Sequence, residues 1–261
     1  MKVLRKTFVW VITLLYLGLV SGFVSNRYEN LLCNSITINI KDSLNTGFLI
    51  PDDITDLLNH NGISCLGIPL GEISLNEIEQ IVRSNQTVEE CNVYTGINGV
   101  LHIDIEQREP FVRIIDRKGQ GYYLDRDGNV LKLSDRFTPH VLVVNGDIYS
   151  PFKIGDPVNV MELEEDKWQK RIKEIYELSR FISQNDLWRA HIEQVYINQS
   201  GEYELVPRIG PHIILLGEIE GYRKKFEKLE IFYKEGLNRI GWNQFLKINL
   251  KYKDQIVCTK I

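Results

Sequence analysis

Hydrophobic positions along this chain follow three patterns, and the first is an uninterrupted apolar run near the amino terminus. Residues 8–24 read FVWVITLLYLGLVSGFV and include no charged side chain. A run of about 17 apolar residues is at the short end of what crosses a bilayer as a helix. Lys2, Arg5 and Lys6 precede the run, and such positive charges stay on the cytoplasmic side. The pattern predicts a cytoplasmic tail over residues 1–7, a transmembrane helix over 8–24 and a bulk that lies outside the cytoplasm.

Two other interpretations of this run stay open. Small residues at Ser21 and Gly22 would suit a signal peptidase, so the segment could be a cleaved signal peptide. The apolar run is longer than a usual signal-peptide core and has no clear A-x-A site, which favours the anchor. A buried core helix is the third interpretation. It is disfavoured because the run is apolar on every face and lies at a chain end.

The second pattern is an α+β arrangement of apolar positions over residues 35–107. Ile36, Ile38 and Ile40 alternate with polar residues, which predicts a strand with one buried face. The sequence SLNE that starts at Ser74 fits a capping box ahead of an amphipathic helix. The predicted elements are a strand near 36–40, helices that begin at Pro51 and Ser74, and strands at 88–95 and 100–107. Their order is β-α-α-β-β.

The third pattern covers residues 110–261 and predicts a mostly antiparallel β-domain with two helices. Asp125-Arg-Asp-Gly128 separates two of its strands. It resembles the start of an EF-hand loop, but the spacing to a distal Glu is wrong for calcium, so a hairpin turn is favoured. The predicted strands cover 111–115, 122–125, 130–133, 141–145, 192–198, 202–207, 212–216 and 244–258, and the predicted helices cover 161–185 and 222–235.

Composition narrows the classes of protein. Hydrophobic residues make up 43% and charged residues 25% of 261 positions, which is ordinary for a globular chain and excludes a collagen, a disordered polar chain and a multi-span membrane protein. The formal net charge is −4, but residues 222–261 are strongly basic while the middle of the chain is acidic. An acidic middle disfavours nucleic acid as a partner.

Candidate chemistry is sparse. The sequence has no HExxH, GxSxG, SxxK or phosphate-loop motif, so we expect no catalytic residues, no metal ligands, no cofactor and no small-molecule substrate. The four cysteines include no CxxC pair, which disfavours a zinc ribbon or a thioredoxin-type site. Cys65 and Cys91 are candidates for a disulfide in an oxidising compartment, and two free buried thiols are the alternative.

Several motifs, in their order along the chain, resemble the bacterial FtsQ/DivIB cell-division family. The stretch IDIEQREPFVRI carries a polar-Arg-x-Pro junction at residues 107–110. Tyr123, Asp125 and Gly128 match a family hairpin, and residues 141–146 match the strand ending in glycine that follows it. The tail GWNQFLKINLKYKDQIVCTKI resembles the family's final strand in a form typical of Bacteroidetes-like members. The module over 35–107 resembles a POTRA domain.

This resemblance implies a non-enzymatic, single-pass inner-membrane scaffold at the division septum, with most of the chain in the periplasm. Its implied partners are FtsB- and FtsL-type coiled-coil proteins, and its implied role is to help control septal peptidoglycan synthesis. A POTRA-type accessory protein of outer-membrane assembly or secretion is the alternative. A membrane-anchored hydrolase is a third candidate.

A partner surface is predicted on the terminal strand. Side chains alternate along a strand, so one set is expected to face the core and the other to face solvent. The core-facing set is Leu246, Ile248, Leu250 and Tyr252, and the largely cationic solvent-facing set is Phe245, Lys247, Asn249, Lys251 and Lys253. A strand at the chain end is expected to lie at a sheet edge, where a partner can add a strand. In the resembled family the last strand binds FtsB. The predicted partner-binding residues are Phe245, Lys247, Asn249, Lys251, Tyr252 and Lys253.

Overall fold

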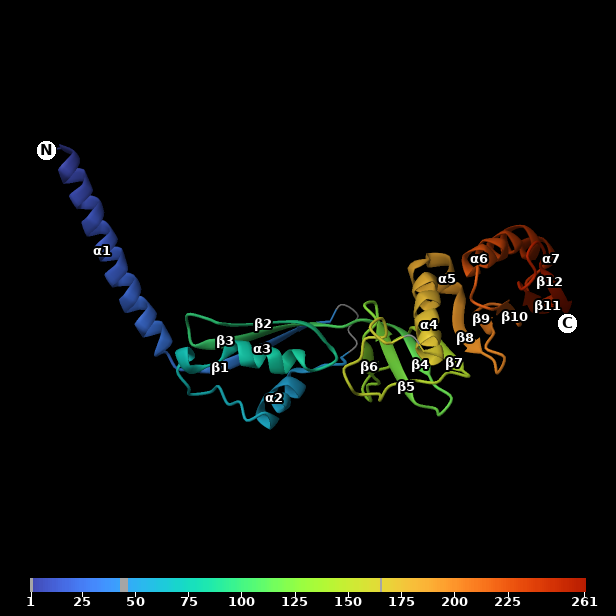
Figure 1. The fold of residues 1–261 in the computed structure, drawn as a ribbon, viewed down its shortest axis with the longest axis horizontal. Helices are drawn as coiled ribbons and strands as arrows, with labels where there is room; N and C mark the ends of the chain where they lie inside the picture. The colour runs from blue at the N-terminus through green and yellow to red at the C-terminus, as the bar shows by residue number, and fades with distance from the viewer. Residues whose placement is uncertain (1, 43–46, 165) are drawn as a thin grey trace. The chain divides into compact units, whose positions relative to one another are not determined.

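The computed structural model describes residues 2–42, 47–164 and 166–261, without the side chains of 2–9 and 23–27. The described chain forms two compact units (Figure 1). The amino-terminal unit contains residues 2–42 and 47–107, and the carboxy-terminal unit contains the described residues from 108 to 261.

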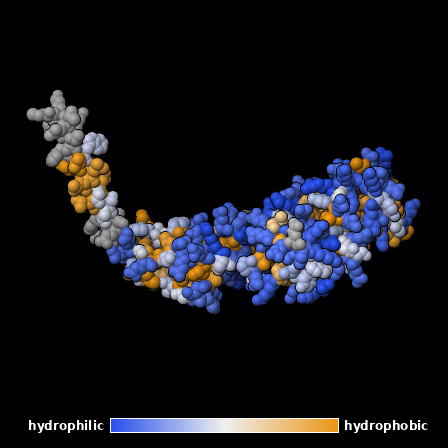
Figure 2. Space-filling view, in the orientation of Figure 1, coloured by the Kyte–Doolittle hydropathy of each residue, from blue (hydrophilic) through white to orange (hydrophobic). Residues whose placement is uncertain are grey.

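A long helix, α1 (Lys2–Glu29), opens the amino-terminal unit. Its described side chains over 10–22 are exposed, and apolar ones appear along it in orange in Figure 2. Among the residues that the structure describes, no helix is both long and apolar enough to cross a membrane. The transmembrane helix predicted over 8–24 is therefore not confirmed. Part of that segment and the predicted cytoplasmic tail over 1–7 lie where side chains are not described, and both assignments stay predictions.

A three-stranded sheet forms the centre of the amino-terminal unit. The central strand β3 pairs in parallel with β1 and antiparallel with β2. This confirms the predicted β-α-α-β-β order, and a short 3₁₀ turn, η1, precedes the second helix. The elements are β1 (Ser35–Lys41), α2 (Pro51–His60), η1 (Leu70–Glu72), α3 (Leu75–Arg83), β2 (Val88–Thr95) and β3 (Val100–Gln107).

The core of this unit lies between the two helices and one face of the sheet. Leu101, Ile103 and Ile105 alternate along β3 and are buried against Ile54 of α2 and Ile78 of α3. The helix that was expected to start with a capping box does start after Ser74, but the Ser74 hydroxyl makes no capping hydrogen bond. The apolar stripe of α3, rather than its cap, therefore holds this helix in place.

A nine-stranded mixed sheet dominates the carboxy-terminal unit (Figure 1). Its order is β12-β11-β10-β9-β8-β7-β4-β5-β6. Pairs β4–β7, β7–β8 and β10–β11 are parallel and the other five are antiparallel, so the sheet is mostly antiparallel as predicted. The strands are β4 (Pro110–Ile115), β5 (Gly121–Asp125), β6 (Val130–Lys132), β7 (Leu142–Gly146), β8 (Ile192–Ile197), β9 (Tyr203–Pro207), β10 (Ile213–Gly217), β11 (Phe245–Asn249) and β12 (Val257–Lys260).

The helices of this unit differ from the two that were predicted. The helix expected from Met161 begins at Lys167, because the Asp166 carboxylate accepts hydrogen bonds from the backbone N–H groups of Trp168 and Gln169 at 2.7 and 2.8 Å. A short additional helix, α5, follows this helix. The helix predicted over 222–235 is α-helical only as far as Ile231 and continues as a π-helical segment. The segments are α4 (Lys167–Gln184), α5 (Asp186–His191), α6 (Tyr222–Ile231), the π segment η2 (Phe232–Leu237) and α7 (Asn238–Ile240).

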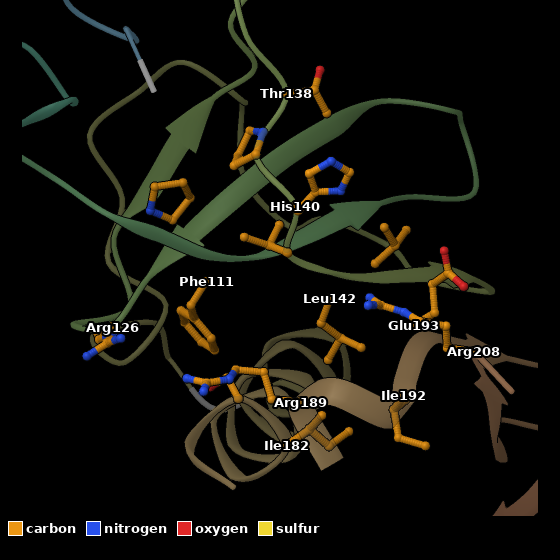
Figure 3. Close-up of a pocket in the computed structure, with 15 residues that line it drawn as sticks. Phe111, Arg126, Thr138, His140, Leu142, Ile182, Arg189, Ile192, Glu193 and Arg208 are labelled. Atoms are coloured by element: carbon orange, nitrogen blue, oxygen red, sulfur yellow. The ribbon is translucent and has the colours of Figure 1, made fainter. Parts of the chain in front are cut away.

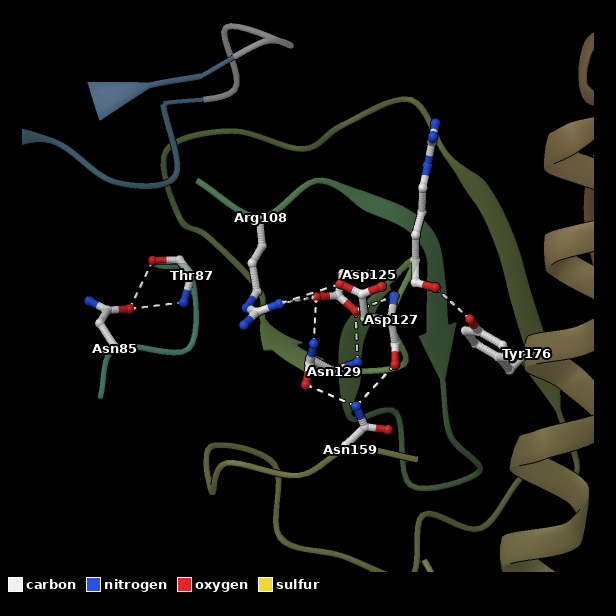
Figure 4. Close-up of polar contacts among 9 residues, drawn as sticks. Asn85, Thr87, Arg108, Asp125, Asp127, Asn129, Asn159 and Tyr176 are labelled. Atoms are coloured by element: carbon white, nitrogen blue, oxygen red, sulfur yellow. Dashed lines mark hydrogen bonds and ion pairs between the residues drawn. The ribbon is translucent and has the colours of Figure 1, made fainter. Parts of the chain in front are cut away.

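The Asp-Arg-Asp-Gly motif forms the β5–β6 hairpin turn (Figure 4). The Asp125 carboxylate accepts from the backbone N–H groups of Asp127 and Asn129 at 3.0 and 2.7 Å. It also accepts from the Asn129 side chain at 2.9 Å and from Arg108 at 2.8 Å. Gly128 has a φ of 89°, which a residue with a Cβ rarely adopts. The turn interpretation, rather than the calcium loop, is confirmed.

Candidate functional site

The predicted terminal strand over 244–258 is a hairpin of two short strands. β11 pairs in parallel with β10 on one side and antiparallel with β12 on the other. Since β11 has a neighbour on each side, it is not the sheet edge that the sequence predicted. The edge is β12, and within the described part of the chain no strand pairs with its outer side.

A register shift in β11 changes which residues face the core. The pairing of β11 with β12 shifts between Phe245 and Lys247, as at a β-bulge. A bulge adds one residue and reverses the inward and outward alternation beyond it. Phe245 is therefore buried, although it was expected to face solvent, and Leu246 is 45% exposed, although it was expected in the core. Ile248 is fully buried, as predicted.

The turn between the two strands carries most of the remaining predicted partner residues. Tyr252, which the alternation placed on the core face, is 49% exposed. Lys247 and Lys253 are exposed and have no side-chain partner among the described residues. The Asn249 side chain accepts a hydrogen bond from the Lys251 backbone N–H at 3.0 Å. The structure therefore leaves Lys247, Tyr252 and Lys253 available to a partner and places Phe245 in the core.

Lys251 is paired rather than free. Its Nζ lies 3.0 and 3.1 Å from the two carboxylate oxygens of Glu202, which belongs to the turn before β9. This hydrogen bond lowers the pKa of Glu202 below its usual value. The methylene stem of Lys251 also covers Gly217, where an added Cβ would come within 2.7 Å of Lys251 Cγ. Lys251 therefore fixes the hairpin to the neighbouring strands.

Lys228 is a residue that sequence reasoning missed. Its Nζ projects from α6 and donates to the carbonyl oxygens of Leu250 and Gln255 at 3.3 Å each, and also to that of Tyr252. Burial of the ammonium lowers the pKa of Lys228. One cation therefore organises the β11–β12 turn, although the sequence shows it only as one of several lysines on a basic helix.

A buried polar cluster lies behind the hairpin. The hydroxyl of Tyr233, in η2, lies 3.1 Å from His191 Nε2 and 3.4 Å from His212 Nε2. Trp242 packs against all three rings. Burial lowers the pKa of both histidines, and the charge of His212 lowers that of His191 further. The cluster connects α5, the residue before β10 and η2, and Trp242 lies shortly before β11.

The four cysteines are free thiols in the structure. Cys65 and Cys91 are both buried in the core of the amino-terminal unit and form no disulfide with each other. Burial raises the pKa of the Cys91 thiol to about 11, and that of Cys65 is raised by burial and by the nearby Cys33. A buried thiol with a raised pKa is a poor nucleophile, which favours the alternative of inert core cysteines.

No group of three or more metal-ligating side chains occurs among the described residues, at the hairpin or elsewhere. The hairpin offers hydrogen-bonding backbone, exposed apolar side chains and lysines. This chemistry suits the capture of an extended peptide.

Two family models match the chain. One, described as FtsQ/DivIB, C-terminal related, covers residues 109–259, and the other, described as a POTRA-like domain, covers residues 31–106. No curated protein matches the chain. The first match spans the whole described carboxy-terminal sheet apart from its last residue, including the β11–β12 hairpin.

Proposed function

Because this chain belongs to the FtsQ/DivIB family, whose members are non-enzymatic scaffolds of cell division, we propose that it links FtsB- and FtsL-type coiled-coil proteins at the septum. In this role it helps to control septal peptidoglycan synthesis. The membrane anchor over 8–24 and the periplasmic location of the bulk are parts of the same proposal. They are supported by the uncharged run and by the basic residues before it.

The observation that carries the proposal is the open edge of β12. Its backbone groups on the outer side have no strand partner among the described residues, so a partner segment can extend the sheet. Val257 on β12 is 42% exposed and Tyr252 in the adjacent turn is 49% exposed, which supplies apolar contacts beside the backbone hydrogen bonds. Lys247 and Lys253 would attract an acidic partner segment.

Removal of β12 tests this site. A chain that ends at Ile256 and is otherwise complete lacks the edge strand β12. We expect its binding to the FtsB/FtsL-type partner of the same bacterium to weaken at least about 100-fold. The matched control lacks only Ile261, which lies beyond β12 and is 71% exposed. Biolayer interferometry measures binding, and a thermal melt checks that both chains are folded. A folded truncated chain that still binds would show that the edge is not the site.

Depletion in cells tests the wider function. Loss of the protein is expected to give filamentous cells, and expression of the full chain, but not of the chain ending at Ile256, is expected to restore division. Normal division after depletion would contradict a division role whatever the binding assay shows.

The POTRA-like match over residues 31–106 favours one further candidate, an accessory role in outer-membrane assembly or secretion. Depletion would then reduce the amount of outer-membrane proteins before any change in cell length. Filaments with a normal outer-membrane protein profile would exclude this second function.

A further inference from the structure

A pocket of about 330 Å³ lies where the parallel strands β4, β7 and β8 begin (Figure 3). Its floor is apolar and comes from Phe111 of β4, Leu142 of β7, Ile182 of α4 and Ile192 of β8. All four side chains are buried in the main core of the carboxy-terminal unit. The pocket therefore has a rigid hydrophobic base of a size that accepts one or two side chains of a ligand.

Three arginines surround this base, and each comes from a different element. Arg126 lies in the β5–β6 turn, Arg189 in α5 and Arg208 directly after β9 (Figure 3). All three are exposed, and Glu193 is the one acidic residue among those that line the pocket. The rim therefore carries an excess of positive charge over an apolar floor.

The backbone positions of these arginines are fixed by the fold. The Tyr176 hydroxyl donates to the Arg126 carbonyl oxygen, and the same tyrosine ring packs edge-on against Phe111, with ring centroids 5.6 Å apart. The Arg208 backbone N–H donates to the carbonyl oxygen of His191 at 2.7 Å. The rim is thus built on ordered elements and needs little ordering when a ligand binds.

Two of the three guanidinium groups are available. Arg189 forms an ion pair with Asp186 at 2.7 Å. The side chains of Arg126 and Arg208 have no hydrogen-bond or ion-pair partner in the described parts of the chain. A free guanidinium binds a carboxylate through two parallel hydrogen bonds.

We propose that this pocket binds an acidic peptide segment of a partner protein. An apolar side chain of the segment enters the floor, and carboxylates on either side meet Arg126 and Arg208. Glu193 lies beside Arg208 on the rim, where its carboxylate can accept a hydrogen bond from a peptide N–H (Figure 3). The lining residues include none from β11 or β12, so the pocket is a surface separate from the β12 edge.

The test uses the full-length protein in detergent micelles and a fluorescein-labelled peptide with the sequence Gly-Glu-Leu-Asp-Gly. Fluorescence anisotropy is expected to show saturable binding that weakens with added salt. The peptide Gly-Gln-Leu-Asn-Gly replaces both side-chain carboxylates with amides of the same shape. It is expected to bind at least about tenfold more weakly. Equal binding of the two peptides, or no binding of the acidic one at millimolar concentration, would overturn the proposal.

Charge-reversal variants test whether the peptide binds in this pocket. The double variant Arg126→Glu with Arg208→Glu is expected to lose at least about tenfold in affinity. The matched control, Lys224→Glu with Arg239→Glu, makes the same change of net charge at exposed positions in α6 and α7 and is expected to keep most of the affinity. Equal losses of affinity in the two double variants would mean that the basic carboxy-terminal region attracts the peptide non-specifically. That result would contradict binding in the pocket.

A variant that fills the pocket and leaves the net charge unchanged provides an independent test. Ser183 lines the pocket and is partly buried, so Ser183→Trp fills the space without altering the charge. We expect it to abolish peptide binding while the thermal melt stays cooperative. Retained affinity in a folded Ser183→Trp chain, or displacement of the peptide by inorganic phosphate at equal concentration, would show that a peptide does not occupy this pocket.

Discussion

The two edge strands of the nine-stranded sheet differ in whether another segment of the chain covers them. At one edge, β6 is covered by residues 158–160: the Val130 N–H donates to the Val158 carbonyl at 2.9 Å, and the Val160 N–H donates to the Gly128 carbonyl at 2.8 Å. Asn159 adds side-chain hydrogen bonds to Asp127 and Asn129. At the other edge, β12 has no such cover among the described residues.

This difference shows which edge of the sheet is open to an additional strand. An uncovered edge strand invites unwanted pairing, so folded chains usually close it with a loop, a bulge or charged residues. Here the β6 edge is closed by a loop and a buried carboxylate. β12 carries only Lys260 as a charged residue, and Val257 on the same strand is exposed. The contrast is the one expected if β12 pairs with another chain.

The largest expected effect comes from breaking the closed edge. Asp125 is 3% exposed and its carboxylate accepts four hydrogen bonds, one of them from Arg108. Asp125→Ala leaves those donors without an acceptor and is expected to lower the free energy of unfolding by about 3–5 kcal/mol. Urea denaturation followed by circular dichroism measures the loss.

The control for this prediction lies two residues away. The side chain of Asp127 is 69% exposed and 4.0 Å from Arg108, so Asp127→Ala removes the same charge from the same turn. We expect it to cost less than about 1 kcal/mol. Similar costs for the two variants would mean that the buried carboxylate does not hold this edge together.

The next largest effect is expected at the open edge. Lys228→Met keeps the apolar stem on α6 but removes the ammonium that binds three carbonyl oxygens of the β11–β12 turn. Those carbonyls can turn to water, so we expect a cost of about 1 kcal/mol and faster hydrogen exchange over residues 250–256. Lys224→Met, an exposed site one turn earlier, is expected to leave exchange there unchanged. Equal exchange in the two variants would contradict the role of Lys228.

A smaller effect is expected from pH, through the cluster behind the open edge. His191 and His212 both contact Tyr233 and Trp242, and burial lowers the pKa of each histidine below its usual value. The unfolded chain therefore binds protons first as the pH falls. The free energy of unfolding is expected to be at its full value above about pH 7 and to fall as the pH drops below about 6.5.

The two histidines can be tested against an exposed one. His212→Gln should flatten the pH dependence of urea denaturation between pH 7.5 and 5.5, and His140→Gln, at an exposed position, should leave it unchanged. An unaltered slope in His212→Gln would assign the pH dependence to other groups.

Much of the fold was predictable because burial imposes a clear period on the sequence. Along β3, Leu101, Ile103 and Ile105 alternate with polar residues, and the strand and its buried face both follow from that. The Asp125–Gly128 turn was predictable because Gly128 adopts a positive φ and Asp125 accepts backbone N–H groups locally. Both are local effects that a sequence displays directly.

The candidate site was harder to predict because it depends on contacts between distant segments. The bulge near Leu246 changes which side chains of β11 face the core, and no residue type in this stretch of sequence indicates that a bulge is present. The turn after Asn249 is held by Lys228, 24 residues before Tyr252, and no periodic pattern shows that contact. The resemblance therefore directed attention to the terminal segment, while the edge strand itself became clear only from the pairing of β12.

The smallest expected effect concerns the ion pair that fixes the open-edge turn to its neighbours. Lys251 and Glu202 side chains are 40% and 32% exposed, so solvent and salt screen their attraction. A double-mutant cycle with Lys251→Met and Glu202→Gln is expected to give a coupling of about 0.2–1 kcal/mol. Because the pKa of Glu202 is lowered, this coupling should be complete at neutral pH and vanish as the carboxylate is protonated on acidification. Sodium chloride at about 1 M should reduce it as well. If the coupling persists in acid and in salt, packing of the Lys251 stem over Gly217 holds the turn, and the open edge owes its order to shape rather than to charge.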